Sequence, residues 1–134
     1  MSSSPQAALT LEQNKQLIVR WFDEVWNNGN RDAICQLFAA DAVLYDGTQV
    51  IRGPMEFEHF YDGLRDQFSN FHVAPVILLA EGDLVCMHWT ASLKHTASGK
   101  PAQITGTSVA RVKNGKFAEA WQNWDAAGLE LQLK

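Results

Sequence analysis

Polar side chains that could do chemistry recur at every second position near the end of the chain. Glu119, Asn123 and Asp125 alternate with other residues, and Trp121 falls on the same spacing. Residues two apart in a β-strand point to the same side of a sheet. If residues 116–125 form a strand, these four side chains share one face.

The dipeptide Asn114-Gly115 is a strong hairpin signal and predicts which face this is. In a two-residue turn Lys113 faces Lys116, and residues directly opposite each other lie on the same side. The side with the larger apolar residues is expected to face the interior. It carries Ile104, Gly106, Ser108, Ala110, Val112, Phe117, Glu119, Trp121, Asn123 and Asp125.

This register predicts a ligand pocket, because polar groups would face an apolar interior that small residues leave partly unfilled. Desolvation disfavours the charged form of a carboxyl and suits it to proton transfer near neutral pH. We therefore expect Asp125 to act as a general acid/base, with Trp121 and Asn123 contacting the ligand. The structural alternative for Asp125 is an N-cap at a strand-to-helix junction.

Other residues are candidates for lining the pocket. Trp21, Tyr45, Tyr61 and Trp89 are expected as pocket walls, although aromatic residues at helical spacing are more often core. His95 has the parity of the apolar face of its strand and is expected at the pocket rim.

Several other kinds of site are not indicated by the sequence. The four histidines show no His-x-x-x-His spacing, so no metal is expected. There is no Gly-x-Ser-x-Gly nucleophile elbow and no phosphate-binding glycine loop. We expect no metal or organic cofactor.

The elements that must position these residues are predicted as helices followed by strands. A helix begins at Thr10 with a capping box to Gln13, a shorter one follows Asn30, and a third begins at Pro54. Strands are expected over residues 42–46, 71–80, 84–96, 103–113 and 116–125, with residues 126–134 as a closing tail. Short turns between successive strands indicate a mainly antiparallel sheet with the three N-terminal helices on one face, which is an α+β fold.

Length and composition agree with one globular domain. The chain has 134 residues, of which 46% are hydrophobic and 19% charged, with a net charge of −4. We expect a domain over residues 10–134 after a disordered tail at 1–9. The lack of a basic cluster argues against nucleic acid or an anionic membrane as partner.

The expected compartment is the cytoplasm, because neither a signal peptide nor a membrane-length apolar run is recognisable. Cys35 and Cys86 are expected to be buried free thiols in a reducing environment.

The chain resembles SnoaL-like proteins, the polyketide cyclase-like members of the nuclear transport factor 2-like superfamily. The resemblance is carried by residues 114–121, by Asp125, and by the pairs 128–129 and 132–133. Segments 14–15, 26–30 and 81–83 also fit, so the likeness covers the chain from roughly residue 11 onward.

The resemblance implies a cone-shaped α+β barrel with a deep pocket for a small apolar ligand. It also implies a homodimer packed through the outer sheet face. We expect the large apolar side chain of Trp124 on that face to be buried by the dimer interface. Asp125 matches the position of the acid/base aspartate of characterised cyclases, which close a ring by an aldol reaction without a cofactor. By analogy with other enzymes of the superfamily, Tyr45 is a candidate donor to a ligand carbonyl.

Three functions remain open at this point. The first is a cofactor-independent cyclase or isomerase acting on an apolar carbonyl compound. The second is a non-catalytic ligand-binding or dimeric assembly module of the same fold. An epoxide hydrolase is the third, and it would need further polar partners to hold an activated water.

Overall fold

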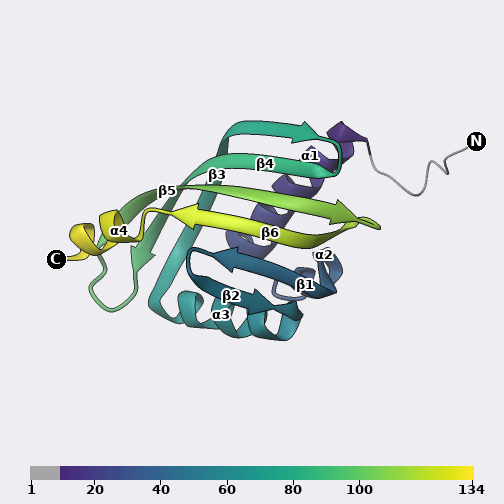
Figure 1. Ribbon diagram of the computed structural model, residues 1–134. Helices are drawn as coiled ribbons and strands as arrows, with labels where there is room; N and C mark the ends of the chain where they lie inside the picture. Colours follow the sequence, from purple (N-terminus) through teal and green to yellow (C-terminus); the bar gives the residue numbers. More distant parts are fainter. Residues whose placement is uncertain (1–9) are drawn as a thin grey trace, which may run out of the picture.

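The computed structural model describes residues 10–134, so the tail predicted at residues 1–9 lies outside the described part. The elements are helix α1 (Leu11–Trp21), π-helix η2 (Phe22–Asn27), helix α2 (Ala33–Leu37), strands β1 (Phe38–Asp46) and β2 (Gln49–Arg52), helix α3 (Gly53–Gln67), strands β3 (Phe68–Glu81), β4 (Leu84–His95), β5 (Pro101–Lys113) and β6 (Lys116–Trp124), and helix α4 (Ala126–Leu133). Figure 1 shows this order, and the predicted α+β class is confirmed.

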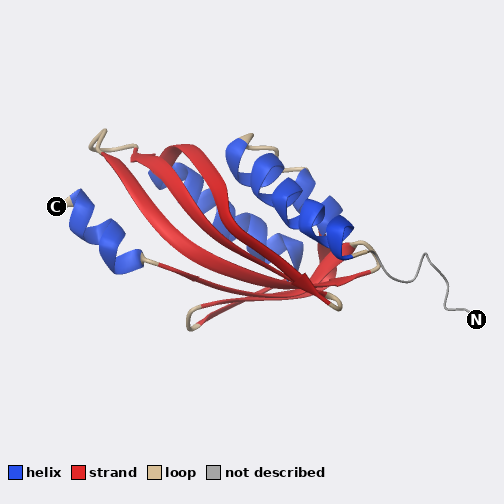
Figure 2. Cartoon of the chain, turned by 90° about the horizontal axis from the view of Figure 1, so that it is seen from above, coloured by secondary structure: helices blue, strands red, loops and turns tan. Residues whose placement is uncertain are grey.

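Within the described residues, six strands form one curved, open sheet in the order β2-β1-β6-β5-β4-β3. Neighbouring strands are antiparallel except β1 and β6, which are parallel. The two long helices lie on the same side of the sheet (Figure 2). We call the helix-covered side the inner face and the opposite side the outer face. Because the sheet is open, the cone is not a closed barrel.

The first helix begins as predicted. The Thr10 hydroxyl accepts from the Gln13 backbone N–H at 3.0 Å, and the Gln13 side chain accepts from the Thr10 N–H at 2.9 Å. The helix then continues as the π-helix η2 instead of ending. Phe22 and Trp26, both on η2, are buried toward the inner face of the sheet.

Strand β2 was not predicted, because its four residues carry too little pattern to recognise. It pairs antiparallel with β1 after a turn at Gly47, which has a φ of +61°. The hairpin turn at Asn114-Gly115 was predicted correctly. Both residues have positive φ, at 53° and 76°, as a type I′ turn requires.

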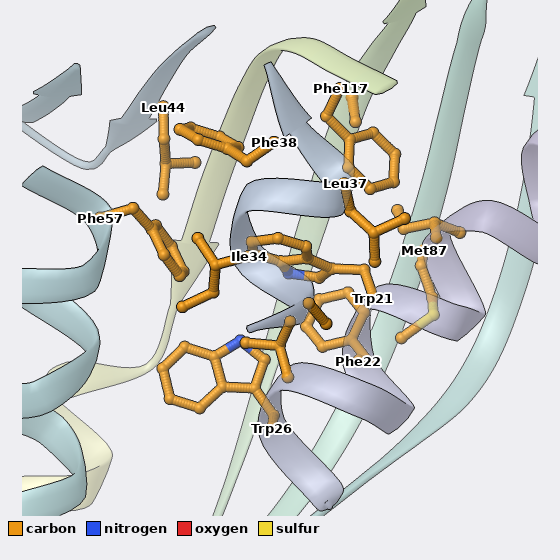
Figure 3. Packing of buried hydrophobic residues seen from close by; sticks show 14 of the residues in the cluster. Trp21, Phe22, Trp26, Ile34, Leu37, Phe38, Leu44, Phe57, Met87 and Phe117 are labelled. Atoms are coloured by element: carbon orange, nitrogen blue, oxygen red, sulfur yellow. The ribbon is translucent and has the colours of Figure 1, made fainter. Parts of the chain in front are cut away.

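The core between helices and sheet is rich in aromatic rings. Trp21 packs against Phe38, Phe57 and Phe117 with ring centroids 5.0–5.9 Å apart. Figure 3 shows these rings with Phe22 and Trp26 around them. Buried aromatic pairs of this kind dominate core stability and hold the helices at a fixed distance from the sheet.

Two expectations about environment can be compared with the structure. No helix within residues 10–134 has the length and apolar character needed to cross a membrane. Cys35 and Cys86 are both free thiols, but Cys35 is exposed and Cys86 is half-buried, so the prediction that both are buried was wrong.

Gly106 provides a test of the packing on the inner face. A Cβ at this position would lie 2.3 Å from Cζ2 of Trp89, so the indole packs directly over the glycine backbone. We expect Gly106→Ala to lower the free energy of unfolding by about 1–3 kcal/mol, because the buried ring must be displaced. Urea denaturation measures this.

The matched control is Gly63→Ala on helix α3, where a Cβ would meet nothing within 4 Å. That variant should be stabilised by about 0.4–1 kcal/mol, since alanine loses less backbone entropy in a helix. Equal stability of the two variants would contradict the observed packing of Trp89.

Candidate functional site

A β-bulge in β6 decides which of its side chains face the interior. The register agrees with the prediction as far as Val112, which pairs with Phe117, but Arg111 then pairs with Glu119. Ala118 is the extra residue. Because side-chain direction alternates along a strand, one extra residue turns every later side chain to the other face. The inward orientation predicted for the alternating set is therefore wrong for Glu119, Trp121, Asn123 and Asp125.

The side chains of β6 that do face inward are those between the predicted ones. Ala120, Gln122 and Trp124 pair with Ala110, Ser108 and Gly106 on β5. Trp124 was predicted on the outer face, and the bulge explains this error as well.

A narrow hollow of about 60 Å³ lies between the helices and the inner face. Gln122 supplies its polar group, and the remaining walls are aromatic or aliphatic. They are Phe22, Trp26, Phe60, Leu64, Phe68, Phe71, Val73, Trp89, Ala91, Leu93, Ile104 and Trp124. A second hollow of about 40 Å³ lies beside it, and Phe22, Trp26 and Gln122 line both.

The carboxyl group of Asp46, at the end of β1, lies beside Gln122, which lines both hollows, although Asp46 itself lines neither. Asp46 pairs with Gln122 in the parallel β1–β6 ladder and shares the inner face with the buried Leu44. Burial raises the pKa of Asp46, and hydrogen bonds from the side chains of Gln122 and Trp124 partly offset this effect. Asp46 therefore has the features sought for an acid/base carboxyl.

Hydrogen bonds connect Gln122 to the interior on its other side. The Ser108 hydroxyl donates to Oε1 of Gln122 at 3.2 Å and accepts from the indole Nε1 of Trp89 at 3.1 Å. Ser108 and Trp89 are both buried. The polar groups in the hollow therefore form one connected set and are not isolated in the apolar interior.

Asp125 occupies a different position from the one predicted. Its side chain is exposed and accepts a hydrogen bond from the Gly128 N–H at 2.9 Å, which makes it the N-cap of α4. Its backbone N–H donates to the Thr105 carbonyl at 3.1 Å. A side chain on Gly128 would meet the Asp125 carboxylate, which would have to shift from its capping position. The geometry matches the structural alternative weighed for Asp125.

Three of the predicted ligand contacts lie on the outer face. Tyr45 and Trp121 stack there with ring centroids 6.1 Å apart and planes inclined by 17°. They are register partners on β1 and β6. Asn123 is exposed on the same face and pairs with Thr107. None of the three lines either hollow.

The remaining four predicted contacts are divided between core, hollow and strand end. Trp89 lines the larger hollow and Trp21 the smaller one. Tyr61 is buried in the core, where its hydroxyl donates to the Val25 carbonyl at 2.7 Å. His95 lies at the end of β4, where its Nδ1 is 2.7 Å from the Ser98 hydroxyl, and it lines neither hollow.

Metal ligands do not gather anywhere in residues 10–134, since no three His, Cys, Asp or Glu side chains there could hold one ion together.

Comparison with known proteins agrees with this architecture. The family model described as SnoaL-like polyketide cyclase matches residues 16–133. The chain belongs to this family. No curated protein matches the sequence.

Solved structures similar to this SnoaL-like protein come from proteins with different descriptions. IdmH from Streptomyces antibioticus, a proposed polyketide cyclase, is 22% identical with a TM-score of 0.81, covering 90% of this chain and 98% of that one. A hypothetical protein of ketosteroid isomerase-like fold from Catenulispora acidiphila is 17% identical with a TM-score of 0.79, covering 87% and 91%. An LEH-like epoxide hydrolase of M. tuberculosis is 17% identical with a TM-score of 0.77, covering 92% and 90%. At these identities the similarity establishes the fold alone.

Sequence reasoning missed Asp46, Ser108 and Gln122 as site residues of this SnoaL-like protein. Asp46 follows Ala42 and Leu44 at strand spacing, which was a usable signal for an inner-face carboxyl. The apolar Val43 and Tyr45 on the opposite parity concealed it. No sequence signal identified Gln122, because its orientation depends on the bulge.

The raised pKa of Asp46 predicts a pH-dependent effect on the stability of the SnoaL-like domain. Below its folded pKa the half-buried carboxyl is neutral, and its favourable contribution is lost as pH rises through that pKa. Asp46→Asn cannot ionise. We expect the stability of this variant relative to wild type to increase as the pH is raised from about 3 to 7. Urea denaturation of both proteins at each pH measures the difference.

Asp41→Asn is the control, because Asp41 is an exposed aspartate of the same strand. A stability difference between Asp46→Asn and wild type that does not vary with pH would contradict the burial of the Asp46 carboxyl.

Proposed function

We propose that this protein binds a small, largely apolar carbonyl compound and transfers a proton on it, with Asp46 as general acid/base in a cofactor-independent cyclisation or isomerisation. The observation that carries the proposal is the position of the Asp46 carboxyl. It lies on the inner face as the register partner of Gln122, whose side chain lines both hollows, and donors from Gln122 and Trp124 favour its charged form. Family membership supports the same class of chemistry.

The ligand class follows from the walls. Apart from Gln122 the larger hollow is lined by carbon-rich side chains, which favour an apolar and preferably flat molecule. At about 60 Å³ the hollow is smaller than a typical ligand pocket of about 300 Å³ or more. Ligand entry therefore requires the half-buried rings of Phe60, Phe71 or Trp124 to move outward.

The chemistry needs one group that alternates between base and acid. The Asp46 carboxylate would remove a proton from the carbon next to a ligand carbonyl and leave an enolate. The enolate carbon could attack a second carbonyl of the same molecule, after which the carboxylic acid returns the proton to the new alkoxide. In an isomerisation the same proton would return to another carbon. A raised pKa suits both half-steps near neutral pH.

Asp125 remains the candidate suggested by the family resemblance, and a non-catalytic ligand-binding module remains the other function considered. Asp125 is exposed at the start of α4, whereas Asp46 is half-buried on the inner face. The geometry therefore favours Asp46. A comparison of the two aspartates separates these possibilities.

The experiment is hydrogen–deuterium exchange at a carbon acid. Small aromatic ketones and 1,3-diketones are incubated with the protein in deuterated water, and deuterium at the α-carbon is followed by NMR. Wild type should accelerate exchange of at least one compound. Asp46→Asn should lose at least about 100-fold of that acceleration, which is the lower range for general base catalysis.

Asp125→Asn is the matched control, because asparagine also caps helices well and should preserve α4. It should retain exchange. Loss of exchange in Asp125→Asn with full activity in Asp46→Asn would refute our assignment and favour the family-based one. Binding of a ketone without exchange by wild type would favour the non-catalytic module.

We also propose that the protein forms a homodimer through the outer face of the sheet. Direct register partners form one row across all six strands of the described sheet. From β2 to β3 the row is Val50, Tyr45, Trp121, Val109, Cys86 and Leu79. Its end residues Val50 and Leu79 are 41% and 59% exposed. The apolar row therefore extends to both edges of the outer face, and burial against another protein surface would stabilise it.

Polar rows border this apolar row on both sides, as expected at a protein interface. On one side Arg111 bridges Glu119 at 3.1 Å and Asp83 at 2.8 Å. On the other side His88 contacts Thr107 at 2.9 Å. A second copy of the chain, related by a two-fold axis, could pack its apolar row against this one, so that both rows are buried.

Trp121→Glu should disrupt the dimer, because it places a charge in the centre of the apolar row. Sedimentation analysis should give twice the 15.0 kDa chain mass for wild type and the single mass for this variant. Met55→Glu, at an 82% exposed position on α3, is the control and should stay dimeric. A monomeric wild type at micromolar concentration would contradict the proposed dimer.

A further inference from the structure

Four strands that are neighbours in the sheet each contribute one side chain to a line of polar groups across the inner face. The strands β4, β5, β6 and β1 are neighbours in the sheet. Their contributions are Trp89, Ser108, Gln122 and Asp46. Trp89 donates to Ser108, Ser108 donates to Gln122, and Gln122 lies directly beside Asp46 in the β1–β6 ladder. Ser108 and Asp46 are the direct register partners of Gln122 on either side, so the backbone ladder itself sets this order.

The hydrogen bonds in this line run from Trp89 through Ser108 to Gln122. The Trp89 indole Nε1 donates and cannot accept, so the Ser108 oxygen receives that bond. The single Ser108 proton is then free to bond Oε1 of Gln122 at 3.2 Å. With its carbonyl end held by Ser108, the amide N–H end of Gln122 is left for its register partner Asp46, and a hydrogen bond from Gln122 favours the charged form of that carboxyl.

We propose that Trp89 and Ser108 are positioning residues that hold the Gln122 amide with its N–H groups toward Asp46 and thereby control the ionisation of the acid/base group. This inference rests on the proposed function, in which Asp46 moves the proton. Trp89 also lines the hollow. A ligand that shifts the indole therefore acts on the same hydrogen bonds that orient Gln122.

Neighbouring charges do not provide an alternative control of this carboxyl. Burial raises the pKa of Asp46 and the hydrogen bonds from Gln122 and Trp124 lower it, with no charged residue among these causes. The titratable groups on β1 and on the elements packed against it are Asp41 and Tyr45 on β1, Arg52 on β2, Lys116 and Glu119 on β6, Cys35 on α2, and Glu56, Glu58, His59, Tyr61, Asp62, Arg65 and Asp66 on α3.

The test is an NMR titration of the Asp46 side-chain carboxyl carbon in a series of variants, which needs no substrate. Gln122→Leu removes the donor, so the charged form loses a hydrogen bond and the pKa should shift upward from the wild-type value. Ser108→Ala and Trp89→Phe break the line one and two steps further away. Each should shift the pKa in the same direction by a smaller amount, because the Gln122 amide is then free to turn.

The conservative variant Ser108→Thr keeps the hydroxyl and should restore the wild-type titration. Thr107→Val is the control, because it removes a hydroxyl from the outer face of the same strand. It should leave the titration unchanged. Amide spectra identify the folded variants, and Trp89→Phe provides the test if Ser108→Ala does not fold.

The outcomes separate this inference from the proposed function. If Asp46 in wild type titrates like an exposed aspartate, the proposed function loses its support. If its pKa is raised but is the same in wild type, Ser108→Ala and Trp89→Phe, the positioning role is overturned and the proposed function stands. A shift in Gln122→Leu alone would likewise overturn the role of Trp89 and Ser108.

Discussion

The arrangement of the site depends on one extra residue in strand β6. A strand alternates its side chains with a period of two, so the bulge at Ala118 exchanges the faces of everything that follows it. Gln122 and Trp124 turn toward the helices, and Trp121 and Asn123 turn away. Without the bulge Trp121 and Asn123 would face the helices in place of Gln122 and Trp124, the two donors to Asp46.

The same displacement gives the two faces of the sheet different properties. On the inner face it aligns Gln122 with Ser108 and Asp46, which places a connected polar line among aromatic walls. On the outer face it aligns Trp121 with Tyr45 and Val109, which produces an apolar row between polar neighbours. The proposed site and the proposed interface are therefore two consequences of one backbone irregularity.

The inner line also shows how a carboxyl can be kept within an apolar cone. Burial alone would favour the neutral acid, whereas donors from Gln122 and Trp124 favour the carboxylate. The opposition of these effects suits a group that must both accept and return a proton. Asp125 has a different environment, since its exposed side chain caps α4 and its neighbour Gly128 makes room for that cap.

Local patterns in the sequence were sufficient for the α+β class, the capping box at Thr10 and the Asn114-Gly115 turn. Each of these depends on residues a few positions apart, where backbone preference and side-chain period act directly. The identity of the inward side chains on β6 was decided only by the tertiary structure. Whether an extra residue is accommodated at Ala118 depends on packing against β1, β5 and the helices, which no short stretch of sequence contains. Asp46, Gln122 and Ser108 come together for a related reason, because β1 must first be placed beside the β5–β6 hairpin from a distant part of the chain.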